Sequence, residues 1–195
     1  EPKTSAGGRH VFGVANGLRL NSSFLILKRP VEPELISQVY QMATRDLNFT
    51  KDARFGKGEC SPNFLLFEEK HEIIEKVSSD LIRMIRHAVQ SDVYVYDSFF
   101  NILRKGGGSL PHHHVKSIDK QMGLSRQKYS LVYYLLAGDQ TCSEPGLLNL
   151  YAPNEDILPS KGMIVIMPAE RKHSAVYSGE EDRIMIGVNF YSLEF

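Results

Sequence analysis

The sequence predicts an α+β fold that is mainly β, in which N-terminal helices pack on one sheet of an antiparallel sandwich or barrel. Two observations predict it. Apolar residues recur at helical spacing only in the first half of the chain, most clearly over Glu72–Val89. After Asp92 the chain contains short strand-like runs separated by turn residues. Helices followed by many short strands are typical of this layered architecture.

The composition sets limits on the class of protein. With 195 residues, the chain fits one domain of ordinary size, and we expect a loose arm over 1–23 followed by a single domain over 24–195. The formal charge is zero, and 42% of the residues are apolar. A neutral chain without a long apolar run predicts no nucleic-acid partner and no membrane partner. The sequence does not indicate an oligomeric state.

The first half predicts one short strand and two helices. Within the arm, Val11–Val14 could add an edge strand. After the arm, Phe24–Leu27 is typical of a short buried strand that ends at Arg29-Pro30. Pro33 suits the first turn of a helix that we expect to run to about Leu47. A loop should cover 48–63 before the second helix. His71 and His87 flank that helix, and we interpret both as exposed or capping residues.

The second half contains only strand-like runs, rich in β-branched and aromatic residues. The expected strands are Val93–Tyr96, Phe99–Leu103, Leu131–Leu136, Leu147–Tyr151, Met163–Met167 and Ile184–Tyr191. The only cysteines are Cys60 and Cys142, which do not make a disulfide framework. We therefore expect a cytoplasmic compartment, although a secretory route stays open because the chain begins at Glu1 rather than Met.

Three consecutive histidines, His112-His113-His114, form the most distinctive motif. In an extended segment, side chains at i and i+2 point to the same face, so His112 and His114 could aim at one point while His113 faces away. Neutral imidazole is the commonest metal ligand in proteins. The motif therefore predicts half of a metal site, with a solvated or structural histidine cluster as the alternative.

A second motif lies further along the chain. Gly162–Pro168 is a turn glycine, a buried strand and a terminating proline, and His173 follows five residues later. This imidazole could reach across a barrel to the first motif. Arg183 comes ten residues after His173, at the start of a strand. An arginine facing inward would need an anion; the alternative is that Arg183 caps a turn beside Glu180.

These residues carry a resemblance to the iron(II)- and 2-oxoglutarate-dependent oxygenases, in particular to the branch whose first motif is His-x-His. The resemblance covers roughly half of the chain, from about Asp97 to Phe190. It rests on these segments: Ser98–Asn101, Lys105-Gly106, His112–His114, Leu131–Leu135, Pro145–Leu150, Gly162–Pro168, His173, Arg183 and Asn189. The fold that it implies is a double-stranded β-helix, a jelly-roll or cupin-like barrel.

The resemblance also implies a function. The cofactors would be Fe(II), 2-oxoglutarate and O2, with the iron held by His112, His114 and His173. Arg183, assisted by the Tyr133 hydroxyl, would bind 2-oxoglutarate. The expected activity is a dioxygenase that hydroxylates a protein side chain, a peptide or a small molecule. Substrate or supporting contacts would come from Asn101, His113, Asn149 and Asn189.

The sequence departs from the wider family at His114, where most members carry Asp or Glu. Three imidazoles could bind the iron, a carboxylate such as Asp119 could replace one of them, or one position could be empty. The polar stretch Val115–Ser130 could be a lid over the substrate.

Two alternatives remain. The first is a cupin-type metal-dependent dioxygenase or isomerase, whose two motifs are approximated by Gly106, His112–His114, Asp119, Gly162, Pro168 and His173. The distance between the two halves is long for a cupin, and Arg183 has no role there. The second alternative is a catalytically degenerate barrel that acts as a binding module.

Overall fold

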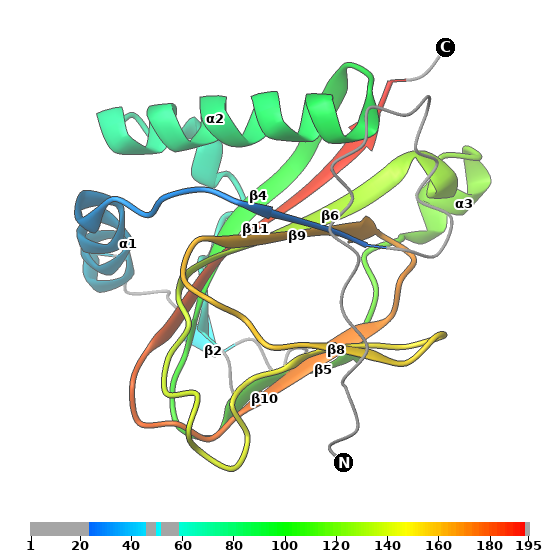
Figure 1. The fold of residues 1–195 in the computed structure, drawn as a ribbon. Coiled ribbons are helices and arrows are strands. Elements are labelled where there is room, and N and C mark those ends of the chain that lie inside the picture. Colours follow the sequence, from blue (N-terminus) through cyan, green and yellow to red (C-terminus); the bar gives the residue numbers. More distant parts are fainter. Residues whose placement is uncertain (1–23, 46–49, 52–58, 194–195) are drawn as a thin grey trace, which may run out of the picture.

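The computed structural model describes residues 24–45, 50–51 and 59–193. The chain forms two antiparallel sheets, with helices on the outer face of the larger one (Figure 1). In spatial order, the larger sheet contains β1 (Leu25–Lys28), β9 (Met163–Pro168), β6 (Lys128–Leu136), β11 (Arg183–Ser192), β4 (Val93–Leu103), β3 (Glu59–Cys60) and β2 (Thr50–Lys51). The smaller sheet contains β5 (Gly107–His112), β10 (His173–Tyr177), β7 (Leu148–Leu150) and β8 (Glu155–Ile157).

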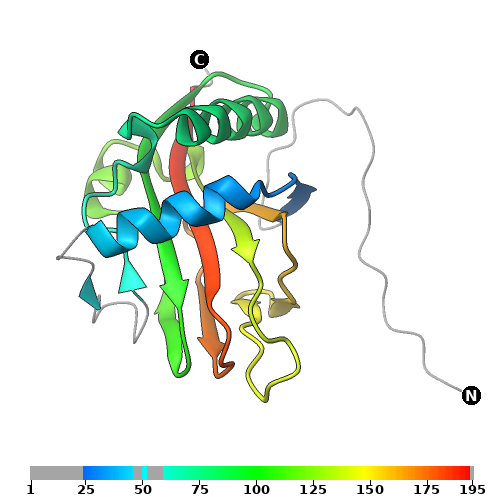
Figure 2. The ribbon, with the colours of Figure 1, turned by 90° about the vertical axis from the view of Figure 1, so that its left-hand side faces the viewer.

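The helices α1 (Pro33–Arg45) and α2 (Glu72–Val89) cover the larger sheet. Figure 2 shows α1 crossing in front of the strands, with α2 above it at the upper end of the sheet. The apolar stripe of α2 is buried, and His71 caps its first turn because the Nδ1 atom accepts the Ile73 N–H at 3.3 Å. The capping role expected for His71 is confirmed. Within the described part of the chain, no helix has both the length and the apolar character that crossing a membrane requires.

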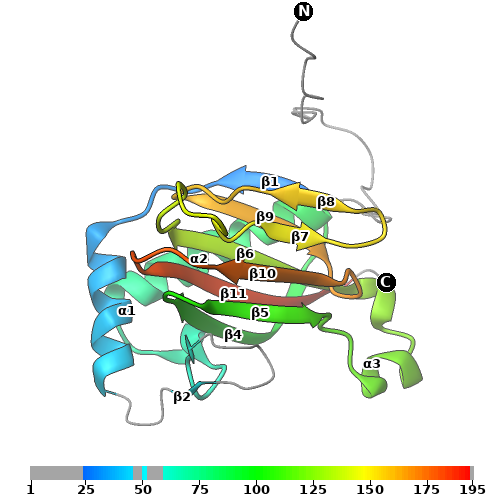
Figure 3. The ribbon, with the colours of Figure 1, turned by 90° about the horizontal axis from the view of Figure 1, so that it is seen from below.

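The central strands are buried on both faces, and their alternation separates two cores. On β6, Tyr129, Leu131, Tyr133 and Leu135 pack with the helices. Val132 and Tyr134 instead face the smaller sheet and pack with its residues. The smaller sheet lies in front of the larger one when the molecule is seen from below (Figure 3). The second face therefore lines a space between the two sheets.

The predicted architecture is confirmed in outline: the chain is mainly β, with antiparallel sheets and helices on one of them. The two runs expected after Asp92 form a single strand, β4. Two short strands, β2 and β3, occupy part of the expected loop over 48–63. The strand expected at Val11–Val14 lies outside the described residues.

The segment Val115–Ser130 is more ordered than the lid that the sequence suggested. It contains α3 (Ser117–Gln121), the 3₁₀ turn η3 (Ser125–Gln127) and the beginning of β6. A second 3₁₀ turn, η2 (Leu66–Glu68), precedes α2. Cys60 and Cys142 are both free thiols.

Candidate metal centre

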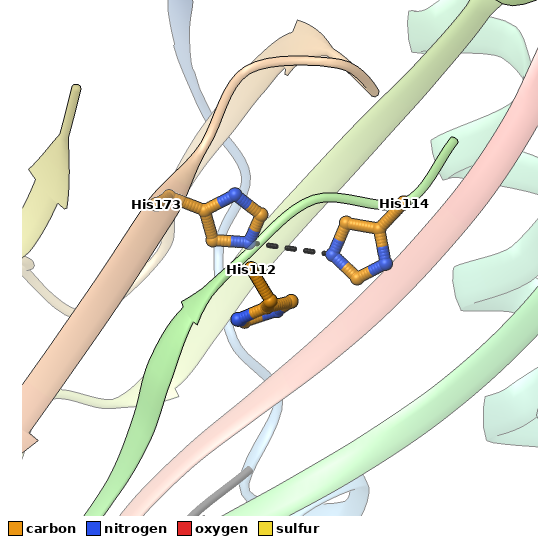
Figure 4. Close-up of side chains that lie close together, drawn as sticks. All are labelled: His112, His114 and His173. Atoms are coloured by element: carbon orange, nitrogen blue, oxygen red, sulfur yellow. Dashed lines mark hydrogen bonds between the residues drawn. The ribbon is translucent and has the colours of Figure 1, made fainter. Parts of the chain in front are cut away.

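Three histidines from two strands of the smaller sheet converge at one point (Figure 4). His112 ends β5, His114 follows two residues later, and His173 begins the neighbouring strand β10, where it pairs directly with His112. The ligand atoms of all three lie within 4.8 Å of one another. The Nε2 atoms of His114 and His173 are 3.3 Å apart. A cation between the rings would meet three nitrogen donors at once.

Backbone contacts hold the three rings in place. The Nδ1 atom of His112 lies 2.6 Å from the Leu110 carbonyl oxygen, and that of His173 lies 2.9 Å from the Arg171 carbonyl oxygen. Because a carbonyl only accepts, both Nδ1 atoms carry the proton and both Nε2 atoms are free to bind a metal. The His114 N–H donates to the Ala169 carbonyl at 2.8 Å, which joins this segment to the end of β9.

The tautomer of His114 follows from its neighbour Asn189. The Asn189 amide nitrogen donates to Asp97 at 2.6 Å, and its oxygen accepts from the Ser130 hydroxyl at 2.6 Å. The NH2 group therefore lies beside His114, 3.5 Å from Nδ1. With Nδ1 as acceptor, the proton of His114 is on Nε2 and is donated to His173.

The electrostatic environment keeps the imidazoles neutral. Burial, reinforced by the neighbouring imidazoles, lowers the pKa of His114 well below its ordinary value, and burial lowers the pKa of His173 to about 4. Burial also lowers the pKa of His112. Neutral imidazole is the form that binds metals, so no ring has to lose a net charge before a cation binds at neutral pH.

The alternative ligand Asp119 is engaged elsewhere. Its buried carboxylate accepts from the Lys128 ammonium at 2.8 Å, from the Lys116 N–H at 2.6 Å and from the Tyr191 hydroxyl. Burial raises the pKa of Asp119, but these donors outweigh it and the net pKa is lowered. The carboxylate therefore ties α3 to β6 and does not join the histidines, which corrects the suggestion that it completes the metal site.

The triad opens into a cavity between the two sheets. Its walls are mostly apolar, and none of the described residues that line it is acidic. They include, besides the three histidines and Arg183, Phe99, Asn101, Ser130, Val132, Tyr134, Leu148, Met185 and Asn189. Inward-facing residues of β4, β6 and β11 alternate with the residues that pack against the helices, so the strand period itself builds the wall.

Arg183 supplies a buried cation to the same cavity. It is 1% exposed, its Nη1 donates to the Gly146 carbonyl, and its guanidinium carbon lies 5.0 Å from the centre of the Tyr134 ring. Its Nε has no hydrogen-bond partner. Among the described residues, no carboxylate forms an ion pair with it. An uncompensated buried guanidinium is costly, which indicates that this end of the cavity receives an anion. The alternative of a solvent-exposed turn cap is wrong.

The Tyr133 hydroxyl, which was expected to bind 2-oxoglutarate, lies on the face of the larger sheet that is opposite to the cavity. Tyr133 points toward the helices, where its hydroxyl donates to the Pro30 carbonyl at 2.8 Å and accepts from Arg29 at 3.0 Å. The next residue, Tyr134, lines the cavity beside Arg183. Because β6 is apolar throughout and buried on both faces, its sequence does not reveal which tyrosine faces inward.

The other expected site residues divide into two groups. Asn101 and Asn189 line the cavity, and the buried Oδ1 of Asn101 has no hydrogen-bond partner. His113 is exposed, opposite in direction to its two neighbours as the alternation predicts. Asn149 donates to Asp156 on the neighbouring strand at 2.8 Å and does not line the cavity. Neither His113 nor Asn149 lines the cavity, so their expected substrate or supporting contacts stay predictions.

The fold is that of the 2-oxoglutarate and iron(II) oxygenases, which confirms the resemblance inferred from the sequence at the level of fold. A viral collagen prolyl hydroxylase from Paramecium bursaria Chlorella virus-1, in complex with 2-oxoglutarate, superimposes with a TM-score of 0.66 at 12% identity, over 91% of this chain and 100% of that one.

Two further solved structures show the same fold. A prolyl hydroxylase from Trichoplax adhaerens, in complex with a hypoxia inducible factor peptide fragment, gives a TM-score of 0.64 at 14% identity, over 88% of this chain and 84% of that one. HygX from Streptomyces hygroscopicus, with nickel, 2-oxoglutarate and hygromycin B bound, gives a TM-score of 0.64 at 12% identity, over 88% of this chain and 84% of that one. No protein-family model matches the sequence, and no curated protein matches it.

Proposed function

We propose that the protein is an Fe(II)- and 2-oxoglutarate-dependent dioxygenase built on a double-stranded β-helix. One observation carries the proposal. Three histidines that can each offer a nitrogen lie in the same cavity as Arg183, a buried cation that pairs with no carboxylate among the described residues. A metal ion and a dicarboxylate are the two ligands that such a cavity would accommodate.

Each group has a distinct role in this proposal. His112, His114 and His173 would hold the iron through Nε2. Arg183 would grip the distal carboxylate of 2-oxoglutarate, with Tyr134 rather than Tyr133 beside it. When bound, iron supplies the oxygen chemistry, by which O2, 2-oxoglutarate and a C–H bond give succinate, CO2 and an alcohol.

The remaining residues of the cavity would bind and orient the ligands. Apolar side chains such as Phe99, Val132 and Leu148 exclude water from the reacting groups. The unpartnered Oδ1 of Asn101 can accept a hydrogen bond from a ligand. Since solved structures of the same fold hold a peptide fragment and hygromycin B, we propose hydroxylation of a peptide, a protein side chain or a small molecule.

Anaerobic titration tests the proposal. Adding Fe(II) and then 2-oxoglutarate should produce a weak visible charge-transfer band. Arg183→Ala should abolish the band at moderate keto-acid concentrations, and Arg183→Lys should weaken it because it keeps the charge but loses the planar fork. Arg104→Ala is the matched control, since Arg104 is half-exposed and pairs with Asp182.

The same experiment distinguishes the alternatives. A cupin-type enzyme would bind the metal and ignore the keto acid. A degenerate barrel that acts as a binding module would bind neither. Either result would refute the proposed dioxygenase.

A further inference from the structure

The cavity has an unusual balance of charge. Its metal-binding groups are neutral imidazoles, Arg183 adds a positive charge, and no acidic residue lies among its described lining residues. The half-buried carboxyl group of Asp97 and the buried one of Asp119 are already engaged. Asp97 is separated from His114 by Asn189, and Asp119 is paired with Lys128. Among the described residues, no carboxylate is therefore placed to coordinate a divalent cation bound by the triad.

We propose that the centre binds its cation tightly only together with an anionic chelator of the α-keto dicarboxylate class, which supplies the negative charge that the protein does not. This inference rests on the proposed function and deepens it. His114 is the residue responsible, because it places a neutral ligand where a carboxylate would compensate part of the cation's charge.

The net charge inside the cavity differs between a triad with a carboxylate and a triad with His114. With a carboxylate in the triad, the cation, the arginine and a bound dianion would sum to a neutral net charge or close to it. With His114, the cation and Arg183 repel each other without compensation until the dianion arrives. Burial makes this repulsion strong, since the triad and Arg183 lie in a cavity with mostly apolar walls.

Linkage makes the coupling measurable from either side. If the dianion strengthens cation binding by some factor, the cation strengthens dianion binding by the same factor. We expect a factor of at least about tenfold, within the usual range for coupled sites. A monoanion such as acetate should give a smaller factor, because it compensates less charge and does not reach from the metal to Arg183.

Calorimetric titration with Co(II) tests the inference without relying on catalysis. The cation is added to the purified chain in a non-coordinating buffer, then in acetate, then in 2-oxoglutarate, with association in solution subtracted. The affinity for Co(II) should be lowest in buffer alone, higher in acetate and highest in 2-oxoglutarate. The visible spectrum of Co(II) gives an independent readout of its coordination.

Two variants identify the role of His114. His114→Asp should bind Co(II) more tightly than the native chain in buffer alone, and its coupling to 2-oxoglutarate should be smaller. His114→Glu is the second variant, since its longer side chain reaches further if Asp is too short. Thermal melts of both, compared with the native chain, establish that they are folded.

The outcomes separate the inference from the proposed function. Tight Co(II) binding by the native chain in buffer alone, or equal coupling in the native chain and both folded variants, would overturn the inference. If 2-oxoglutarate binds in the calorimeter but leaves Co(II) affinity unchanged, the inference fails while the dioxygenase stands. If 2-oxoglutarate does not bind at all, the proposed function fails as well.

Discussion

Replacing Asp119 with asparagine should destabilise the fold and leave metal binding unchanged. Asp119 and Lys128 are each 1% exposed, and their charged groups are 2.8 Å apart. The variant keeps the shape and an acceptor oxygen but removes the charge. Lys128 would then be buried without its counter-charge, beside a neutral amide oxygen and the rings of Tyr96 and Tyr191, at 4.8 and 5.2 Å.

The magnitude follows from the burial of the pair. Removing one partner of a buried ion pair costs about 3–5 kcal/mol because the other charge is left uncompensated. We expect the lower end, about 3 kcal/mol, since the amide oxygen still accepts from the Lys116 N–H and the two rings interact with the cation. The double variant Asp119→Asn with Lys128→Met should regain most of this loss, because no buried charge remains.

Urea denaturation of the metal-free chain measures the first effect, and Co(II) calorimetry measures the second. The unfolding midpoint should fall for the single variant and recover for the double variant. A midpoint that does not move, or an Asp119→Asn chain that is fully stable but has lost Co(II), would refute the reasoning and restore Asp119 as a metal ligand.

Three further predictions concern the cavity. Gly146→Ala should abolish the charge-transfer band, because φ is +74° and a Cβ would lie 1.7 Å from Nη1 of Arg183; a normal band would contradict the placement of the guanidinium. Tyr134→Phe should weaken 2-oxoglutarate binding, measured by calorimetry. Tyr133→Phe should leave that binding intact and lower the free energy of unfolding, measured by urea denaturation, by about 1 kcal/mol. The reverse pattern would refute the assignment of Tyr134 to the cavity. The pKa of His173 is about 4 in the folded chain and ordinarily 6.5. Between these two values the unfolded chain binds a proton at His173 that the folded chain does not bind. His173 should therefore contribute a loss of roughly 3 kcal/mol of stability in the metal-free chain from about pH 6.5 to pH 4, beside the losses from His112 and His114, whose pKa values are also lowered. Urea midpoints should fall less in His173→Gln, and an equal fall would exclude this histidine as a cause.

Local patterns predicted the long elements and two of the three histidines that converge in the cavity. The apolar stripe over Glu72–Val89 gives the exact bounds of α2, because a helix that buries one face has a strong periodicity. The i, i+2 rule placed His112 and His114 on one side of an extended segment with His113 opposite. The triad also required His173 to come from a neighbouring strand, which the order of the motifs suggested.

Non-local packing decided what the sequence left open. β5 has few of the residues that favour strands, since it begins with two glycines and contains Pro111, so its pairing with β10 follows from the sheet rather than from propensity. The inward choice of Tyr134 over Tyr133 depends on strand register. The pairing of Asp119 with Lys128 depends on how α3 folds back onto β6, for which the sequence has no local signal.

The hydrogen bond between His114 and His173 occupies the ring nitrogens that a bound cation would need. A cation at Nε2 of His114 requires the proton to move to Nδ1, which lies 3.5 Å from the NH2 group of Asn189. Turning the Asn189 amide over would set its oxygen against the Asp97 carboxylate, so the amide keeps its orientation and its 2.6 Å hydrogen bond to Asp97. Binding a cation is therefore coupled to the tautomer of His114, and it costs this ring both of its present side-chain contacts.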